Sequence, residues 1–469
     1  MIPYPLFMFR IAWADKSLDL RACQILENGF TFRVASEWEK ELLNPGKYIV
    51  CFQDKETKKY IEYEVTGEVE RIPAETENTD CRNTFNEKKR DVIEVTYSFC
   101  SWDARFLRDF HSMLSDYMHM IRTKTENDDL EAMELLTGIS LSQNYMKDVT
   151  EWKNKFCPNE QKGKKAVDSI KLQPVEIGIS LDCRDFLEKY LEMDFTDFRK
   201  YYFIENHLSD FPITQNKVTH LYVGNAFCPY VFQNPKEDER LIKVLEKSIK
   251  EGLEPVLVFS PIPQSMMNKT EKFLEKVKAF LEKQERKIEV VVNDYGTPIL
   301  LQGLENNFEI TAGILLNKRK KDPRIQTVDS FRTEQLFPGG NMYEEDCILA
   351  ALKNRLNISA VSYEGTGKEY FSGDFSFGKL PAILHIPRFQ VNTSNCMLHS
   401  ICEFGDRGKR GDLSKCPHYC EKKAIFFSDN LPIIGLGNSI FGVSSEEIND
   451  IPFLNSLIQK GVKRIVLRL

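Results

Sequence analysis

Residues 220–260 read HLYVGNAFCPYVFQNPKEDERLIKVLEKSIKEGLEPVLVFS, and this stretch decides the fold. It begins with an apolar segment, 220–227, that predicts a strand ending in a turn. A helix should follow, because Leu241, Leu245 and Ile249 fall on one face and Gly252 lies just past its end. Residues 255–260, PVLVFS, predict a second strand. A strand, a helix and a strand of this length predict two parallel strands joined by a covering helix.

The same alternation continues to the end of the chain. Further apolar strands are predicted in EVVVNDYG (289–296), EITAGILLN (309–317), LPAILHIPRF (380–389) and VKRIVLRL (462–469). Parallel strands covered by helices close into a barrel or form a doubly wound sheet. We therefore expect an α/β fold over 171–469, and the pattern by itself leaves both arrangements open.

The N-terminal part has a different pattern. Residues 27–35, 47–54, 60–72 and 91–99 are rich in β-branched and aromatic residues, which predicts strands. A helix follows, with Ser101 as its cap and one apolar face formed by Phe106, Phe110, Met113, Leu114, Tyr117 and Ile121. We expect a small β-barrel closed by one helix over 1–123. The polar residues 124–170 are predicted to form a helical linker.

Four cysteines cluster in residues 385–425. Cys396, Cys402, Cys416 and Cys420 have the spacing C-x5-C-x13-C-x3-C. Thiolates are soft ligands that suit iron–sulfur clusters and zinc. Structural zinc sites mostly use C-x2-C pairs, which this stretch lacks, so the spacing favours a 4Fe-4S cluster, with zinc as the alternative. The plain alternative is a chance grouping of ordinary thiols.

Composition limits the classes of protein. The chain has 469 residues, 12 cysteines and a formal net charge of −7, which argues against a broad nucleic-acid-coating surface. No apolar run is long enough to span a membrane, and we see no convincing signal peptide. Cysteine-rich chains without export signals point to a reducing compartment, so we expect a cytoplasmic protein. Neither the H-E-x-x-H nor the G-x-S-x-G motif of hydrolases is present.

Two further groups of polar residues are candidates for chemistry. Asn293 and Asp294 follow a predicted strand, and the carboxyl ends of barrel strands collect catalytic groups. The alternative for Asp294 is a turn residue that shapes the loop.

A basic run follows another predicted strand. Substrate phosphate, carboxylate or RNA backbone could bind to Asn317, Lys318, Lys321 and Arg324. The alternative is a solvated charged face.

Several motifs, in order, resemble the peptidase U32 family, also called collagenase-like peptidases. They are LYVGNAFCPYVF, EVVVNDYG, ITAGILLNKRKKDPRI, the cysteine stretch and PIIGLGNSIF, which together cover roughly 215–469. The resemblance implies a (β/α) barrel-like domain with a four-cysteine iron–sulfur cluster. It also implies oxygen-independent hydroxylation of ubiquinone precursors or RNA bases; the peptidase label is older.

The resemblance adds a fifth candidate ligand. In one branch of the family, a cysteine just after the first barrel strand joins a later pair separated by three residues. Cys228 stands at that place, and Cys416 and Cys420 match the pair. The fourth ligand would then be Cys396 or Cys402. Alternatively, Cys228 is a buried thiol at the barrel mouth.

The N-terminal part resembles a PilZ domain, through CQILENGFTF and EVTYSFCSWDARFLRDF. Only Gly29 matches the family's Asp/Asn-x-Ser-x-x-Gly motif, and no Arg-x3-Arg precedes it. Binding of cyclic di-GMP is therefore not expected, since that ligand is held by those arginines. We expect a module that docks a protein partner, with a second U32-type subunit as another candidate partner.

Three functions follow as expectations. The first is an iron–sulfur enzyme that modifies a small aromatic or RNA substrate without molecular oxygen. The second is a peptidase, as the family name says. The third is a non-catalytic, cluster-bearing regulatory or docking protein.

Overall fold

The computed structural model describes most of the chain, in separate segments. They are residues 7–14, 17–35, 38–42, 46–53, 60–72, 94–126, 146–156, 171–209, 211–231, 235–317, 342–344, 346–365, 377–393, 396–405, 411–426, 433–443 and 445–468. The chain divides into two compact units, one with the described residues up to 126 and the other with those from 146 onward.

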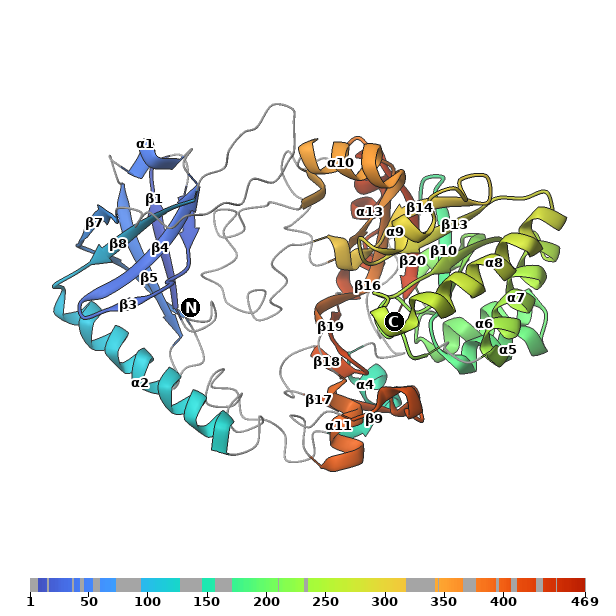
Figure 1. Cartoon of the computed structure of the whole chain (residues 1–469), viewed down its shortest axis with the longest axis horizontal. Helices are drawn as coiled ribbons and strands as arrows, with labels where there is room; N and C mark the ends of the chain where they lie inside the picture. The colour runs from blue at the N-terminus through green and yellow to red at the C-terminus, as the bar shows by residue number, and fades with distance from the viewer. Residues whose placement is uncertain are drawn as a thin grey trace. The chain divides into compact units, whose positions relative to one another are not determined.

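The first unit contains two four-stranded antiparallel sheets and a long helix (Figure 1). One sheet has the order β2-β1-β5-β6, formed by β1 (Phe7–Ala12), β2 (Ser17–Leu20), β5 (Lys47–Gln53) and β6 (Tyr60–Val65). The other has the order β3-β4-β8-β7, formed by β3 (Ile25–Leu26), β4 (Gly29–Ala35), β7 (Glu68–Arg71) and β8 (Glu94–Cys100). The short helix α1 (Glu39–Leu42) and the long helix α2 (Ala104–Glu126) complete the unit. The predicted strands are present as two antiparallel sheets, while the closed small barrel and the PilZ resemblance stay predictions.

Aromatic side chains form the core of the first unit. Phe7, Phe9, Phe30 and Phe99 are buried and in ring contact, and Phe106 and Phe110 of α2 join them. The predicted apolar face of α2 is confirmed for its three buried residues, Phe106, Phe110 and Met113, while the side chain of Ile121 lies outside the described residues. The predicted cap was wrong. The Asp103 carboxylate accepts the backbone N–H groups of Arg105 and Phe106, and Ser101 instead bonds Thr66.

Gly29 and Arg10 have structural roles in this unit. A Cβ at Gly29 would lie 1.9 Å from the carbonyl oxygen of Phe99, so the close approach of β4 and β8 requires glycine. Arg10 is buried and pairs with Asp19 at 2.8 Å and Glu62 at 3.0 Å. Its guanidinium is therefore committed to holding strands together.

The second unit is a closed barrel of eight parallel strands, which confirms the predicted (β/α) barrel. In chain order they are β10 (Glu176–Leu181), β11 (Val218–Gly224), β12 (Glu254–Val258), β13 (Ile288–Val292), β14 (Phe308–Ala312), β15 (Ile358–Glu364), β16 (Ala382–Thr393) and β20 (Val462–Arg468). Each strand pairs with its neighbours in sequence, β20 pairs with β10 and the pairing of β15 with β16 completes the ring. The connecting helices are α5 (Arg184–Glu192), α6 (Phe195–Glu205), α7 (Pro235–Lys250), α8 (Met267–Lys283), α9 (Thr297–Leu300), α10 (Asp346–Leu356), α12 (Ser445–Asn449) and α13 (Ile451–Gln459) (Figure 1).

Both faces of the barrel strands are covered, which explains their nearly continuous apolar sequences. On the outer face, alternate residues such as Ile177, Ile179 and Leu181 pack against the helices. On the inner face, Tyr222, Val256, Val291, Ile383 and Val466 form a small apolar layer across the barrel. Polar side chains lie above and below this inner layer, toward the two ends of the barrel.

Strand β16 leaves the barrel and begins an antiparallel extension. It pairs with β19 (Ser439–Val443), which is followed in the sheet by β18 (Ile433–Leu436), β17 (Lys423–Phe426) and β9 (Met146–Asp148). Strand β9 and helix α4 (Val149–Phe156) fall inside the predicted linker 124–170, yet β9 pairs with β17 of this unit. The predicted linker therefore contains elements of the second unit.

The extension covers the carboxyl end of the barrel. Phe426, Ile434 and Phe441 of the extension form one buried cluster with Phe227 and Ile314, which lie on the loops after β11 and β14. The segment between β16 and β20 thus places helix α11 (Met397–Phe404) and the cysteine stretch near these loops.

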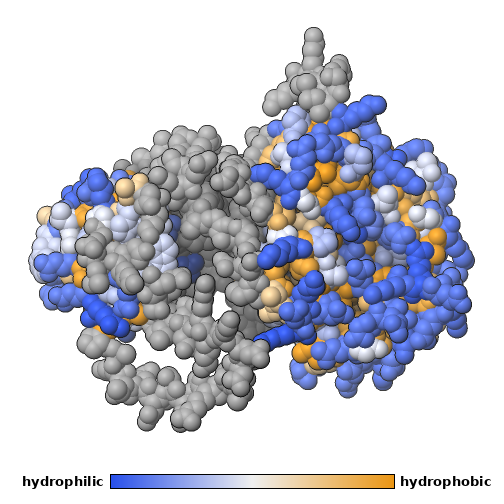
Figure 2. Space-filling model, turned by 90° about the horizontal axis from the view of Figure 1, so that it is seen from above, coloured by the Kyte–Doolittle hydropathy of each residue, from blue (hydrophilic) through white to orange (hydrophobic). Residues whose placement is uncertain are grey.

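The described surface of the second unit is mainly hydrophilic on the face seen in Figure 2, with hydrophobic side chains in smaller groups. Among the helices of the described segments, none combines the length and apolar character needed to cross a membrane.

Candidate metal centre

Four of the five candidate cysteines line one cavity. They are Cys228, Cys396, Cys416 and Cys420, and the cavity encloses about 340 Å³ with its opening included. Cys402 lies one helical turn after Leu398 of α11 and is not among the lining residues. The structure therefore brings together the pair Cys416/Cys420, the barrel cysteine Cys228 and, of the two remaining candidates, Cys396.

The loop that carries Cys228 is held by two asparagines. Asn225 Oδ1 accepts the backbone N–H groups of Phe227 (2.9 Å) and Cys228 (2.8 Å), and Asn225 Nδ2 donates to the carbonyl of Asp182 (2.9 Å). From the extension, Asn438 Nδ2 donates to the carbonyl of Phe227 at 2.9 Å. These bonds fix the position of Cys228 relative to both the barrel and the extension.

Local backbone geometry orients two of the other thiols. Cys396 is the N-cap of α11, and its sulfur accepts the N–H of His399 at 3.4 Å. The sulfur of Cys416 accepts the N–H of His418, also at 3.4 Å, where His418 adopts a left-handed conformation with φ 62°. Peptide N–H groups directed at sulfur stabilise its thiolate form and raise the reduction potential of a bound cluster.

Burial keeps three of the thiols of this cavity protonated in the absence of a cation. It raises the pKa of Cys228 to about 11 and that of Cys396 to about 12, and it raises the pKa of Cys420 well above its usual value. Repulsion from other thiols of the cavity raises the pKa of each of these three further. A metal ion would have to displace the protons, so its binding would release protons.

Four thiols are chemically suitable ligands for a metal centre bound by thiolates. In the described segments, however, no three His, Cys, Asp or Glu side chains are grouped closely enough to hold a single metal ion. Four thiolates around one zinc ion lie about 3.8 Å apart, as follows from a Zn–S bond of about 2.3 Å in a tetrahedron. The thiols would therefore have to move closer together to bind one zinc ion. The sulfur ligands of a multinuclear cluster lie farther apart than those of a single ion.

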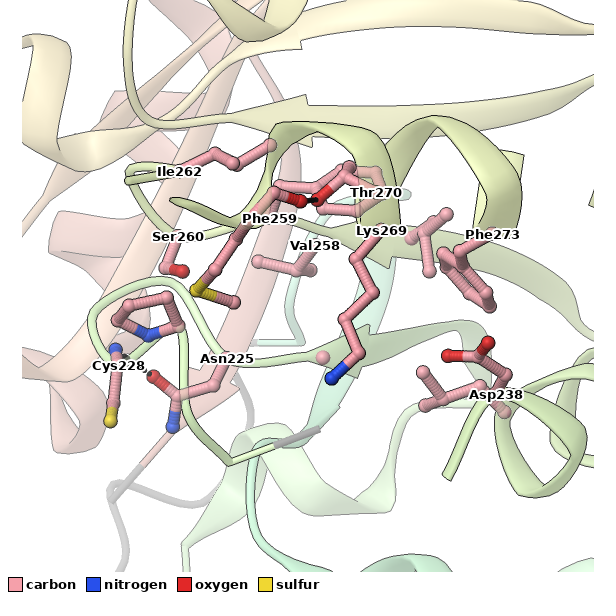
Figure 3. Close-up of a pocket in the computed structure, with 15 residues that line it drawn as sticks. Asn225, Cys228, Asp238, Val258, Phe259, Ser260, Ile262, Lys269, Thr270 and Phe273 are labelled. Atoms are coloured by element: carbon pink, nitrogen blue, oxygen red, sulfur yellow. Dashed lines mark hydrogen bonds between the residues drawn. The ribbon is translucent and has the colours of Figure 1, made fainter. Parts of the chain in front are cut away.

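An open hollow adjoins the loop of Cys228 (Figure 3). It measures about 630 Å³ with its mouth included and lies between that loop, the end of β12 and helix α8. Apolar side chains such as Phe259 and Phe273 line much of it, and Lys269 extends into it (Figure 3). Cys228 lines both this hollow and the thiol cavity, so the hollow reaches the same loop from its other side.

The predicted catalytic residues Asn293 and Asp294 lie at the end of β13. The Asn293 amide donates to the carbonyl of Phe259 (2.7 Å) and accepts the N–H of Leu315 (3.1 Å). Gly313 is needed beside it, because a Cβ there would lie 2.3 Å from Asn293 Oδ1. Asn293 thus ties together the loops after β12, β13 and β14.

Asp294 has a similar role. Its carboxylate accepts the N–H of Ile262 (2.8 Å) and both the N–H (2.6 Å) and the hydroxyl (3.0 Å) of Thr297 at the start of α9. These contacts match the turn-shaping alternative, and the catalytic role of both residues stays a prediction.

Of the four predicted substrate-binding residues, only Asn317 is described. It is buried, and its Nδ2 donates to the carbonyl of Ser362 at 3.3 Å. Lys318, Lys321 and Arg324 lie outside the described residues.

Sequence analysis missed a buried ionic group at the carboxyl end of the barrel. Asp182 Oδ2 accepts from both Arg388 (2.8 Å) and Arg468 (3.1 Å). The Arg388 guanidinium lies 4.5 Å from the ring centre of Phe441, and that of Arg468 lies 4.4 Å from that of Phe227. The available signal was a charged residue ending each of three apolar strands, in ISLD, HIPR and VLR.

These features define a (β/α)8 barrel whose carboxyl end carries a thiol-lined cavity. No protein-family model, curated protein or solved structure matches this chain.

Proposed function

We propose that the second unit is an iron–sulfur protein of the peptidase U32 type. One observation carries the proposal: four thiols from three separate chain segments line one cavity at the carboxyl end of a (β/α) barrel. Four cysteine ligands are what a 4Fe-4S cluster takes. The sequence motifs that resemble the U32 family favour the same cofactor.

The proposed ligands are Cys228, Cys396, Cys416 and Cys420. The cluster would supply electron transfer or a Lewis-acidic iron to the reaction. Asn225 and Asn438 hold the loop of Cys228, and the N–H groups of His399 and His418 donate to two of the sulfurs.

The proposed activity is an oxygen-independent hydroxylation, or a related modification, of a small aromatic or RNA substrate. In such a hydroxylation an oxygen atom passes from a reducible oxygen-containing donor to a substrate C–H bond. The donor is reduced by two electrons and the substrate is oxidised by two, so molecular oxygen is not consumed. The hollow beside Cys228 gives a substrate access to the loop that carries this ligand, with apolar walls suited to a ring.

Metal analysis of the anaerobically purified full chain tests the cofactor. We expect a brown protein with absorbance near about 400 nm and about four iron atoms per chain. A colourless protein with one zinc per chain would contradict the proposal and favour the zinc alternative.

Comparison of cells with and without the protein tests the activity. We expect mass spectrometry to show the loss of a hydroxylated nucleoside or small aromatic product from anaerobic cells that lack it. Restoration by the wild-type chain but not by Cys416→Ser would link the product to the metal centre. If the cluster is present but neither product pool changes, the enzyme proposal fails and a non-catalytic role is favoured.

A further inference from the structure

One residue of the thiol cavity has a side chain with no role in the proposed ligand set. His399 lies in the first turn of α11, three residues after the ligand Cys396, and it lines the cavity together with the four cysteines. The residue is only 4% exposed. Its imidazole is therefore a polar group that is held at the metal site and shielded from water.

The Nδ1 atom of His399 is buried and has no hydrogen-bond partner in the described part of the chain. Among the described residues that line the cavity, no other side chain has a buried nitrogen or oxygen atom in this state. A buried polar atom without a partner costs about 1–3 kcal/mol, so in native proteins such an atom usually has a bound group as its partner. A group bound in the thiol cavity would provide that partner.

Packing holds the imidazole ring in place beside the cavity. The ring centre lies 6.4 Å from that of Phe404 and 6.3 Å from that of Tyr419, and both neighbouring rings are tilted against it. A Cβ at Gly411 would lie 2.8 Å from Cε1 of His399, so glycine makes room for the ring there. Tyr419 is itself held, because its hydroxyl donates to Glu403 at 2.6 Å.

The backbone of the same residue already contacts the site. The N–H of His399 donates to the sulfur of Cys396 at 3.4 Å, which is part of the N-terminal cap of α11. A ring N–H of His399 would be a second donor from one residue. Both donors are fixed by the first turn of the helix, so they would be in position before a cofactor binds.

We propose that the imidazole of His399 donates a hydrogen bond from Nδ1 to a sulfur atom of the 4Fe-4S centre. This inference rests on the proposed function. Sulfur bound to iron carries no proton and can only accept, so the ring must carry a hydrogen on Nδ1. A hydrogen bond to sulfur stabilises the more negative, reduced form of the centre and raises its reduction potential. His399 would thus set the potential without binding iron.

A redox titration of the anaerobically purified full chain, followed by EPR, tests this proposal. At a fixed potential, His399→Phe should lower the ratio of reduced to oxidised centre about tenfold, which is about 59 mV for a one-electron couple. Iron per chain should stay at the wild-type level. His399→Asn, whose amide N–H can replace that of Nδ1, should keep the ratio within about twofold of wild type.

A matched control uses the buried histidine near the start of β11, at the opposite end of the barrel. His220→Phe should leave the potential unchanged. Equal potentials in wild type and His399→Phe would overturn the proposal. Equal lowering in His399→Phe and His399→Asn would also overturn it, because the effect would then follow from packing and not from an N–H donor.

Pulsed EPR of the wild-type protein decides the question if His399→Phe does not fold or loses iron. Histidine labelled with ¹⁵N only in its ring should show a nitrogen coupled to the reduced centre. The coupling should persist in His418→Phe, since His418 also lines the cavity. Absence of the coupling, or its loss in His418→Phe, would refute the role of His399.

Iron analysis separates this inference from the proposed function. A wild-type chain without iron would reject both. A wild-type chain with about four iron atoms, together with an unchanged potential in His399→Phe, would reject the role of His399 alone and leave the iron–sulfur proposal standing.

Discussion

The two ends of the barrel use the same kinds of side chain in different ways. At the amino end, Arg464 donates to Glu176 (2.9 Å), Glu289 (2.7 Å) and the hydroxyl of Tyr222 (2.9 Å). At the carboxyl end, two arginines share Asp182, and His385 has no described partner. The amino end is a closed network that stabilises the barrel. The carboxyl end leaves polar groups and thiols facing cavities, as expected where a barrel binds its ligands.

The largest expected effect is a loss of metal from the thiol cavity. Cys416→Ser should abolish metal binding, because one of the four proposed ligands is lost. Cys402→Ser, at the thiol outside the cavity, should keep iron near the wild-type level. Iron per chain and the visible spectrum measure both variants. Equal loss in the two would mean that Cys402 is a ligand and that the set of four is wrong.

The next effect concerns the amino end. Arg464→Met should destabilise the second unit by about 3–5 kcal/mol, because it leaves the largely buried Glu289 carboxylate without its charged partner, with only the hydroxyl of Thr311 still bonded to it. Metal content per folded chain should not change. The exposed pair of Lys250 and Glu246 offers a control, and Lys250→Met should cost less than about 1 kcal/mol. Thermal unfolding measures both, and a small effect of Arg464→Met would show that this end does not stabilise the barrel.

A smaller effect is expected at the support of the Cys228 loop. Asn225→Ala removes the acceptor of two backbone N–H groups and should lower metal affinity roughly 10–100-fold, as loss of other groups that orient ligands does. Competition with a chelator measures the affinity. Asn216→Ala is the matched control, because it removes a hydrogen bond from an asparagine side chain just before β11, at the amino end. It should not change the metal affinity. An unchanged affinity in Asn225→Ala would show that the loop holds its position without this side chain.

The smallest effect is a pH dependence shared by the two ends. Burial lowers the pKa of both His220 and His385 to about 3 in the folded chain, against about 6.5 unfolded. Between these values the unfolded chain binds a proton that the folded chain does not. Stability therefore falls with acidification, by about 1.4 kcal/mol per pH unit for each histidine.

Replacing either histidine should reduce this acid sensitivity. Between pH 6.5 and pH 5, His220→Gln and His385→Gln should each lose about 2 kcal/mol less stability than wild type. Denaturant titrations of the second unit at both pH values measure the difference. An unchanged slope in His385→Gln would mean that the ring of wild-type His385 is already protonated in the fold, which would contradict the neutral ring expected from its burial.

Strand and helix periodicity was sufficient to predict parallel strands covered by helices, and the family resemblance favoured a barrel over a doubly wound sheet. Apolar strands alternate with helices over 220–260 and beyond, and the strands are apolar throughout because both of their faces are buried in a parallel sheet. This pattern can be recognised within short segments of the chain. The same pattern did not show that β9 joins the second unit, because a three-residue strand carries little periodic signal.

The sequence was sufficient to predict which cysteines are candidate ligands, but not which of them lie together in one site. The clustering of Cys396, Cys402, Cys416 and Cys420 is visible in the sequence, and the family resemblance added Cys228. Spacing could not select among them, because the direction of each thiol depends on caps and turns such as the N-cap position of Cys396. The roles of Asp182, Arg388 and Arg468 were missed because each is an isolated charge at a strand end, far from the others in the chain.

The sequence by itself determined which segments become strands and helices, since apolar periodicity and helix stops act over a few residues. It also determined that soft ligands are concentrated in one stretch. Only the tertiary structure decided which four thiols share a cavity and which polar groups inside the barrel are left without partners. The physical reason is barrel closure, which brings the ends of strands far apart in the chain to one rim and pairs or isolates their side chains there.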